Sequence, residues 1–86
     1  MVKELLKRII INPKVMVGKP VIKGTRIPVD MIIRLLAQGM TTKEILEDYP
    51  QLKEEDIKAA LIYCAEIVEG KTVLPILEKE HVKIFS

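Results

Sequence analysis

The sequence predicts a mainly α-helical domain in which three helices follow a small β element and an extended segment ends the chain. Three observations support this prediction. Prolines and glycines punctuate short β-branched runs in residues 1–28. Residues 28–70 carry apolar side chains at helical spacing. Residues 71–86 are apolar as well, but Pro75 among them argues against a central strand.

The β element is expected over about residues 8–27, as two or three short strands separated by turns. The strand-like runs lie at residues 8–11, 15–17 and 21–22. The turn signals between them are Asn12-Pro13 and Gly18-Lys19-Pro20. Residues 2–7 fit a helix or a strand equally well.

The first helix is expected from about residue 28 and ends at Gly39, which suits the left-handed residue after a helix. Pro28 suits a first helical turn because its missing N–H would have no partner there. Asp30 is favoured near the same end by the helix dipole. Four apolar residues share one face of this helix: Val29, Ile32, Ile33 and Leu36.

The second helix is short and lies within residues 41–49. Thr41 and Glu44 have capping-box spacing, in which the hydroxyl and the carboxylate each accept a hydrogen bond from the other residue's free amide. Pro50 ends this helix. Its apolar side consists of Ile45, Leu46 and Tyr49.

The third helix is expected from about Lys53 to Glu69, with Gly70 ending it. Its acidic first turn is interpreted as a solvated face that the helix dipole favours. The acids are Glu54, Glu55 and Asp56. The expected buried stripe is Ile57, Ala60, Leu61, Cys64 and Ile67 or Val68. Two short helices and a longer one are typical of a helix-turn-helix unit, although spacing alone favours any small three-helix bundle.

Length and composition indicate one small domain, residues 1–70, with residues 71–86 as a C-terminal arm. At 86 residues and 49% hydrophobic content, the chain is short for the apolar surface it carries, so we expect a homodimer or larger assembly. Aromatic residues make up 3% of the chain, so few side chains are available to stack on the bases of a single-stranded nucleic acid. A single cysteine and no signal-peptide pattern lead us to expect a cytoplasmic protein.

Charge divides the chain into a basic and an acidic half. Residues 1–40 have a net charge of +6 and residues 41–86 have −4. A basic surface of this kind is a candidate for contact with nucleic-acid phosphates. Because acids fill the first turn of the third helix, that turn would face phosphates badly. The residues predicted to bind DNA are Lys14, Lys19, Lys23, Arg26, Arg34 and Lys43.

The C-terminal arm carries more apolar residues than a solvated terminus needs. It is either a strand that folds back onto its own domain or an arm that binds a partner chain. Pro75 favours an extended, edge-type conformation. The predicted partner-binding residues are Val73, Leu74, Ile76, Leu77, Glu78, Glu80, Val82, Ile84 and Phe85.

The sequence shows no constellation for catalysis, metal binding or a cofactor. Cys64 and His81 are each the only residue of their type, whereas a metal site needs three or four ligands and a nucleophile needs an oriented base. Cys64 lies on the expected buried stripe and is interpreted as a core residue. The glycine-containing segments around Gly18 and Gly24 do not match the spacing of a phosphate-binding loop.

The most distinctive motif is Gly18-Lys19-Pro20-Val21-Ile22-Lys23-Gly24-Thr25-Arg26-Ile27-Pro28. Thr25 and Arg26 are expected to fix a turn in it, with phosphate contact by Arg26 as the alternative. Together with Leu35–Met40, Glu44–Pro50 and Glu54–Leu61, the motif resembles the domain-of-unknown-function family 433 (DUF433), over about residues 8–69. Where that family usually has Thr or Ser, this chain has Lys53, so the third helix is expected to start loosely or to use Gln51.

The resemblance implies a homeodomain-like helix-turn-helix fold and the role of a VapB-type antitoxin. Such a protein inhibits a PIN-like nuclease toxin and binds the double-stranded promoter DNA of its own operon. The alternatives are a protein-interaction or dimerisation module that does not bind DNA, and a stand-alone DNA-binding regulator. An enzyme is not expected.

Overall fold

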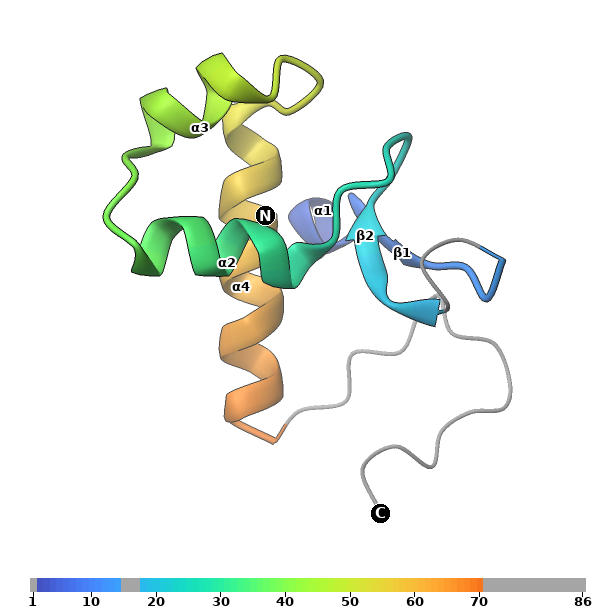
Figure 1. Cartoon of the computed structure of the whole chain (residues 1–86). Helices are drawn as coiled ribbons and strands as arrows, with labels where there is room; N and C mark the ends of the chain where they lie inside the picture. Colours follow the sequence, from blue (N-terminus) through green and yellow to red (C-terminus); the bar gives the residue numbers. More distant parts are fainter. Residues whose placement is uncertain (1, 15–17, 71–86) are drawn as a thin grey trace.

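The computed structural model describes residues 2–14 and 18–70, and this part of the chain is mainly helical (Figure 1). The expected strand at residues 15–17, the C-terminal arm at residues 71–86 and His81 lie outside the described residues. The elements in chain order are α1 Val2–Leu6, β1 Ile9–Ile11, β2 Pro20–Ile22, α2 Val29–Ala37, α3 Thr42–Asp48 and α4 Glu54–Val68. In Figure 1, α2 crosses the middle of α4, and α3 lies near the beginning of α4.

The structure resolves the first residues as a helix. A five-residue helix has little stability of its own, because the conformational entropy lost in ordering its first turn exceeds the free energy gained from so few hydrogen bonds. Packing stabilises α1: it lies against α4, and Leu5 and Leu6 contact the core. Contact with α4 therefore decides a conformation that the local sequence leaves open.

The two predicted strands that fall in the described residues are confirmed as an antiparallel pair. The register pairs Ile9 with Ile22 and Ile10 with Val21. Pro20, which has no N–H for a ladder, is the first residue of β2, a position where proline is tolerated. Val21 also bridges to Pro28, so the chain is still extended immediately before α2.

That bridge corrects the expected start of α2. Pro28 is the N-cap residue with an extended backbone (ψ 148°), and the helix begins one residue later, at Val29. Asp30 does lie in the first turn. Gly39, with φ +100°, follows the end of the helix as predicted.

The capping box predicted for α3 is confirmed. The Glu44 N–H donates to Thr41 Oγ1 at 3.1 Å, and the Thr41 N–H donates to Glu44 Oε1 at 2.9 Å. Ile45 is fully buried, while Leu46 and Tyr49 are partly buried.

The stripe predicted for α4 is partly wrong. Ile57 and Ala60 are buried, and Cys64 and Ile67 pack against the core, as predicted. Leu61 is exposed instead, as is Val68, the alternative to Ile67, while Ala59 and Tyr63 are buried although they were not in the predicted stripe. Apolar residues occur on two sides of this helix, so its spacing is compatible with more than one buried face. Contacts with α1 and α2 select the face that is buried. The core is formed by Ile9, Ile22, Ile27, Val29, Ile32, Ile45, Leu52, Ile57, Ala59, Ala60 and Tyr63.

Candidate nucleic-acid interface

Three segments that are distant in the sequence meet at one end of the hairpin, and we call this region the basic junction. It comprises Lys7 and Arg8 after α1, the turn Lys23–Arg26 after β2, and the connection Gln51–Lys53 before α4. The Lys23 N–H donates to the Arg8 carbonyl oxygen at 2.7 Å. Arg8 Nη1 lies 2.9 Å from Asp56 Oδ1 at the start of α4. Gln51 and the turn together line an open hollow of about 560 Å³.

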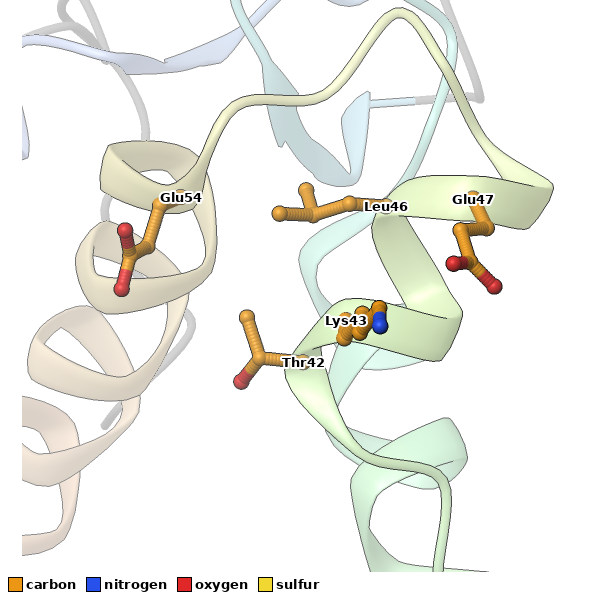
Figure 2. A pocket seen from close by; sticks show the side chains of 5 residues that line it. All are labelled: Thr42, Lys43, Leu46, Glu47 and Glu54. Carbon is orange, nitrogen blue, oxygen red and sulfur yellow. The ribbon is translucent and has the colours of Figure 1, made fainter.

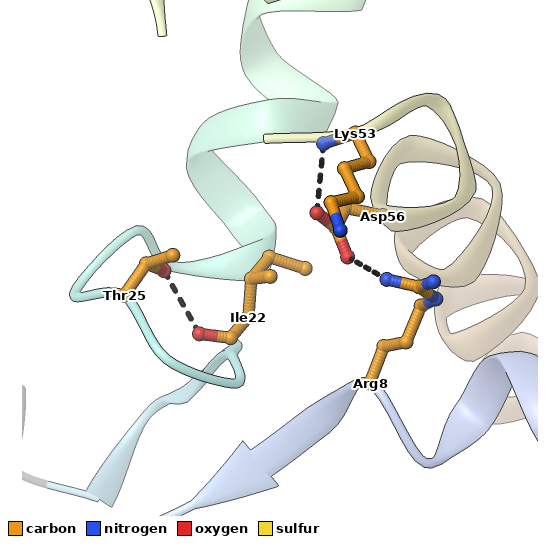
Figure 3. A network of polar contacts seen from close by, with 5 residues as sticks. All are labelled: Arg8, Ile22, Thr25, Lys53 and Asp56. Carbon is orange, nitrogen blue, oxygen red and sulfur yellow. Dashed lines mark hydrogen bonds and ion pairs between the residues drawn. The ribbon is translucent and has the colours of Figure 1, made fainter. Parts of the chain in front are cut away.

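Thr25 fixes the turn of the basic junction. Its Oγ1 donates to the Ile22 carbonyl oxygen at 2.8 Å and accepts from the Ile27 N–H at 2.9 Å. Figure 3 shows the first of these bonds. Gly24 adopts φ +83°, a conformation that side chains with a Cβ rarely adopt. The expected turn-fixing role is therefore confirmed for Thr25.

Asp56 connects the start of α4 to the rest of the junction. One carboxylate oxygen pairs with Arg8, and the other accepts from the Lys53 N–H at 2.8 Å (Figure 3). Asp56 is only 4% exposed, so its interpretation as part of a solvated face is wrong. It also corrects the expectation of a loose helix start or a cap by Gln51, because its carboxylate satisfies the N-cap amide.

The junction presents positive charge outward. Lys7, Lys23, Arg26 and Lys53 are exposed. Within residues 2–14 and 18–70, the three ion pairs involve Arg8, Lys19 and Arg34, and none involves these four cations. Asp56, whose carboxylate bonds to Arg8 and to the Lys53 N–H, is buried, so both of its oxygens already have partners. Cations arranged in this way can contact the phosphates of a nucleic acid.

A second group of the predicted DNA-binding residues lies at the opposite end of the hairpin. Lys19 precedes β2 and Lys23 follows it, so about 13 Å of extended chain separates them. Lys19 Nζ and Arg34 Nε lie 3.5 Å and 3.7 Å from the same Asp30 oxygen. Asp30 therefore offsets part of their charge. Lys14 is exposed in the connection between β1 and β2, which is also at this end.

Lys43 lies in a different, more acidic setting on α3. It lines an open hollow of about 460 Å³ between α3 and α4, together with Leu46, Glu47 and Glu54 (Figure 2). Two carboxylates against one ammonium make this hollow unfavourable for phosphate. Glu54 and Glu55 are exposed at the start of α4. The expectation that this helix start faces phosphates badly is consistent with their exposure.

Three cations of the junction were absent from the predicted set: Lys7, Arg8 and Lys53. Lys7 directly precedes the strand-like run predicted at residues 8–11 and Arg8 begins it, and that position is a signal that could have placed them beside Lys23. Lys53 had no such signal, because the contacts that bring its segment to the hairpin, the ion pair of Asp56 with Arg8 among them, join residues that are far apart in the sequence.

Groups for nucleophilic or metal chemistry are not gathered in the described part of the chain. No cluster of three histidine, cysteine, aspartate or glutamate residues that could hold a metal ion occurs in residues 2–14 and 18–70. Burial, and next the nearby charge of Asp30, raise the pKa of the half-buried Cys64 thiol above its ordinary value. A thiol with a raised pKa stays protonated at neutral pH and is a poor nucleophile and ligand. Of the described helices, none has the length and apolar character needed to cross a membrane.

Comparison with known families gives a match over most of the described region. The family model described as "Protein of unknown function (DUF433)" matches residues 9–64. A solved crystal structure of a DUF433 member from Anabaena variabilis is similar at a TM-score of 0.69 and 39% identity, covering 80% of this chain and 68% of that one.

Two similar sequences are themselves uncharacterised proteins. Protein y4eO of Sinorhizobium fredii strain NGR234 is 38% identical over 52 residues, which cover 60% of this chain and 24% of that protein. A protein of Archaeoglobus fulgidus is 63% identical over 30 residues, which cover 35% of this chain and 83% of that protein. The match therefore spans about a quarter of the length of the Sinorhizobium relative.

Proposed function

The chain belongs to the DUF433 family of proteins of unknown function, and from that premise we propose that it is an antitoxin that binds promoter DNA and inhibits a PIN-like ribonuclease. The observation that carries the DNA-binding half is the basic junction. Four exposed cations lie in the segments that meet there, and the carboxylate of Asp56 in the same region is buried and bonded to Arg8 and a backbone amide. A phosphate backbone would complement such a surface.

In this proposal, α2, α3 and α4 form a homeodomain-like unit that contacts DNA in an unusual way. A standard recognition helix would place the start of α4 in the major groove. Here Glu54 and Glu55 are exposed at that position. The junction, with Lys23 and Arg26 on a rigid turn, is a more favourable surface for phosphates.

The antitoxin half of the proposal rests on the chemistry of residues 71–86. Their apolar residues suit the edge of a partner's sheet or a groove. Glu78 and Glu80 suit the basic cleft of a ribonuclease, since they can occupy the place of RNA phosphates. A cytoplasmic location would place the chain beside both partners.

The DNA-binding surface can be tested with two matched pairs of substitutions. Lys23→Gln/Arg26→Gln and Lys19→Gln/Arg34→Gln each remove two positive charges, but only the second pair contacts a carboxylate. Binding to duplex DNA from the chain's own promoter is measured between about 50 and 200 mM salt. We expect the first pair to lower the slope of log affinity against log salt by about 1.8. The second pair should change it much less.

If both pairs gave the same DNA affinity and the same salt slope, the basic junction would not be the surface that binds DNA. Absence of salt-sensitive binding by the unaltered chain would remove DNA binding altogether. Inhibition of the nuclease without DNA binding would then favour the interaction-module alternative.

The antitoxin role can be tested with the product of the neighbouring gene, which the proposal expects to be a PIN-like nuclease. RNA cleavage is measured with the full chain and with a chain that ends at Gly70. We expect the full chain to inhibit cleavage and the shortened chain to lose inhibition, because the apolar and acidic arm is missing. Equal inhibition by both chains would contradict the role of the arm. DNA binding without any inhibition would favour a stand-alone regulator.

A further inference from the structure

The hollow at the basic junction is lined by one polar side chain that the proposed function does not use. Gln51 lines this hollow together with the turn residues Gly24 and Arg26. Its side chain is exposed, and within residues 2–14 and 18–70 it forms no hydrogen bond. The cap at the start of α4 that it was expected to supply comes from Asp56 instead. The amide of Gln51 is therefore available to a ligand that enters the hollow.

The hydrogen-bonding capacity of the other junction side chains distinguishes Gln51 from them. The four exposed cations of the junction are donors only. The Thr25 hydroxyl already donates to the Ile22 carbonyl oxygen and accepts from the Ile27 N–H. An amide side chain carries two N–H donors and a carbonyl acceptor. Among the side chains of the basic junction, Gln51 is therefore the one with both a donor and an acceptor free.

Aliphatic side chains line the same hollow. Ile10 of β1 is half-buried and Ile27 is 9% exposed, and both line the hollow with Gln51. Positive charge lies beside them, because Arg26 also lines the hollow and Lys53 follows Gln51 by two positions. The hollow thus combines a free amide and aliphatic surface with cations that can contact phosphates.

We propose that Gln51 hydrogen-bonds to the edge of an adenine in the major groove of duplex DNA while the cations contact the phosphates; this inference rests on the proposed function. In that groove, adenine presents the acceptor N7 beside the donor N6, and one amide side chain complements both. The thymine paired with it presents a methyl group, which an aliphatic side chain can contact. An A·T pair therefore matches both the amide and the aliphatic surface of the hollow.

The other base-pair edges match this hollow less well. In the major groove, guanine presents two acceptors, and cytosine presents a donor without a methyl group. In the minor groove, an A·T pair presents acceptors only. The acceptor of Gln51 and the aliphatic surface would then have no counterpart on the DNA. The chemistry of the hollow thus favours an A·T pair contacted from the major groove.

Base recognition by Gln51 and phosphate contact by the cations affect different measured quantities. A neutral amide displaces no counterion from DNA, so its removal should leave the slope of log affinity against log salt unchanged. A lost base contact instead lowers the preference for one sequence over another. The two roles can therefore be measured separately in the same chain.

Binding to two duplexes tests the proposal. They are the chain's own promoter and a scrambled duplex of equal length and base composition, each titrated with the full chain, Gln51→Ala and the matched control Gln38→Ala. Gln38 is the other glutamine of the chain and is exposed at the end of α2. We expect Gln51→Ala to lower the preference for the promoter by about 5- to 150-fold, the range for one bidentate base contact. Gln38→Ala should keep the preference, and all three chains should share one salt slope.

Changes to single base pairs test which atoms are contacted. Each A·T pair of the bound promoter segment is replaced in turn by G·C, and each adenine is replaced by 7-deazaadenine, which lacks the N7 acceptor. We expect at least one position where both changes weaken binding of the unaltered chain, whereas Gln51→Ala binds the altered and original duplexes equally. If Gln51→Ala is as sensitive as the unaltered chain at every position, the proposal is wrong.

Failure of this inference differs from failure of the proposed function. Salt-sensitive binding that does not distinguish the promoter from the scrambled duplex would overturn base recognition and leave the phosphate contacts in place. A preference for a G·C pair that Arg26→Lys abolishes and Gln51→Ala does not would assign recognition to Arg26 and overturn the role of Gln51. Absence of binding to either duplex would contradict the proposed function, and base recognition with it.

Discussion

At the scale of single residues, Asp56 holds the basic junction together. Its two oxygens contact Arg8 and the Lys53 amide, and these partners lie far apart in the sequence. A buried carboxylate is stable only when such partners compensate its desolvation. The positions of the cations in the basic junction thus depend on Asp56, which is itself buried and does not face the proposed DNA.

Asp56→Ala should lower the free energy of unfolding by about 2–3 kcal/mol, because it removes a helix cap and leaves Arg8 without its partner. The estimate is at the lower end for a buried pair, since the Arg8 side chain is 36% exposed. Urea unfolding measures the change. Glu55→Ala, one residue away and exposed, is the control and should stay within about 0.5 kcal/mol. A loss no larger than that of the control would show that the contacts of Asp56 contribute little.

At the scale of elements, α3 and α4 begin differently. Thr41 and Glu44 form a complete capping box at α3. At α4 only the returning half is present: Asp56 accepts from the Lys53 N–H, but a lysine side chain has no acceptor for the amide of Asp56. The Asp56 N–H instead donates to the Lys53 backbone carbonyl oxygen at 2.9 Å, whereas its counterpart in α3, the Glu44 N–H, donates to a side chain.

Lys53→Ser should raise the free energy of unfolding by about 0.5–1 kcal/mol, because serine is a preferred N-cap residue whose hydroxyl can accept from an amide of the first turn, which a lysine side chain cannot do. Gln51→Ser is the control: it adds the same hydroxyl two residues earlier and should leave stability unchanged. Both are compared by thermal and urea unfolding. A lower stability for Lys53→Ser would mean that the lysine contributes contacts of its own, for example through its aliphatic stem.

At the scale of the molecule, the buried core of the described residues lies between positions 9 and 63. The hairpin, α2, α3 and α4 all contribute buried aliphatic side chains, and α1 packs against α4, with Leu5 and Leu6 in contact with the core. Charge is distributed unevenly around this core. The basic junction lies at one end of the hairpin, while Glu47 and Glu54 line the hollow between α3 and α4.

A chain that ends at Gly70 should keep the unfolding free energy of the full chain within about 0.5 kcal/mol, because the buried core of the described residues lies between Ile9 and Tyr63 and stays intact in that chain. Circular dichroism and urea unfolding of the two chains at equal, low micromolar concentration provide the comparison. A clear loss of stability would place residues 71–86 in the core of this chain rather than on a partner.

The sequence by itself determined the features that depend on neighbours along the chain. Gly39 ends α2 and Thr41 caps α3 because left-handed backbone and capping need only a few consecutive residues. The strand pair followed from β-branched runs between turn signals. Such signals depend on a few consecutive residues, so they can be recognised in the sequence without knowledge of the tertiary structure.

Only the tertiary structure decided which of several locally equivalent choices is made. Residues 2–6 became a helix through contact with α4, and α4 turned Tyr63 rather than Leu61 inward. Asp56 changed from an expected surface acid to a buried partner of Arg8, 48 positions away. The predicted DNA-binding residues were divided among the two ends of the hairpin and α3. Burial and ion pairing depend on distances in space, and residues far apart in sequence acquire those distances only when the chain packs.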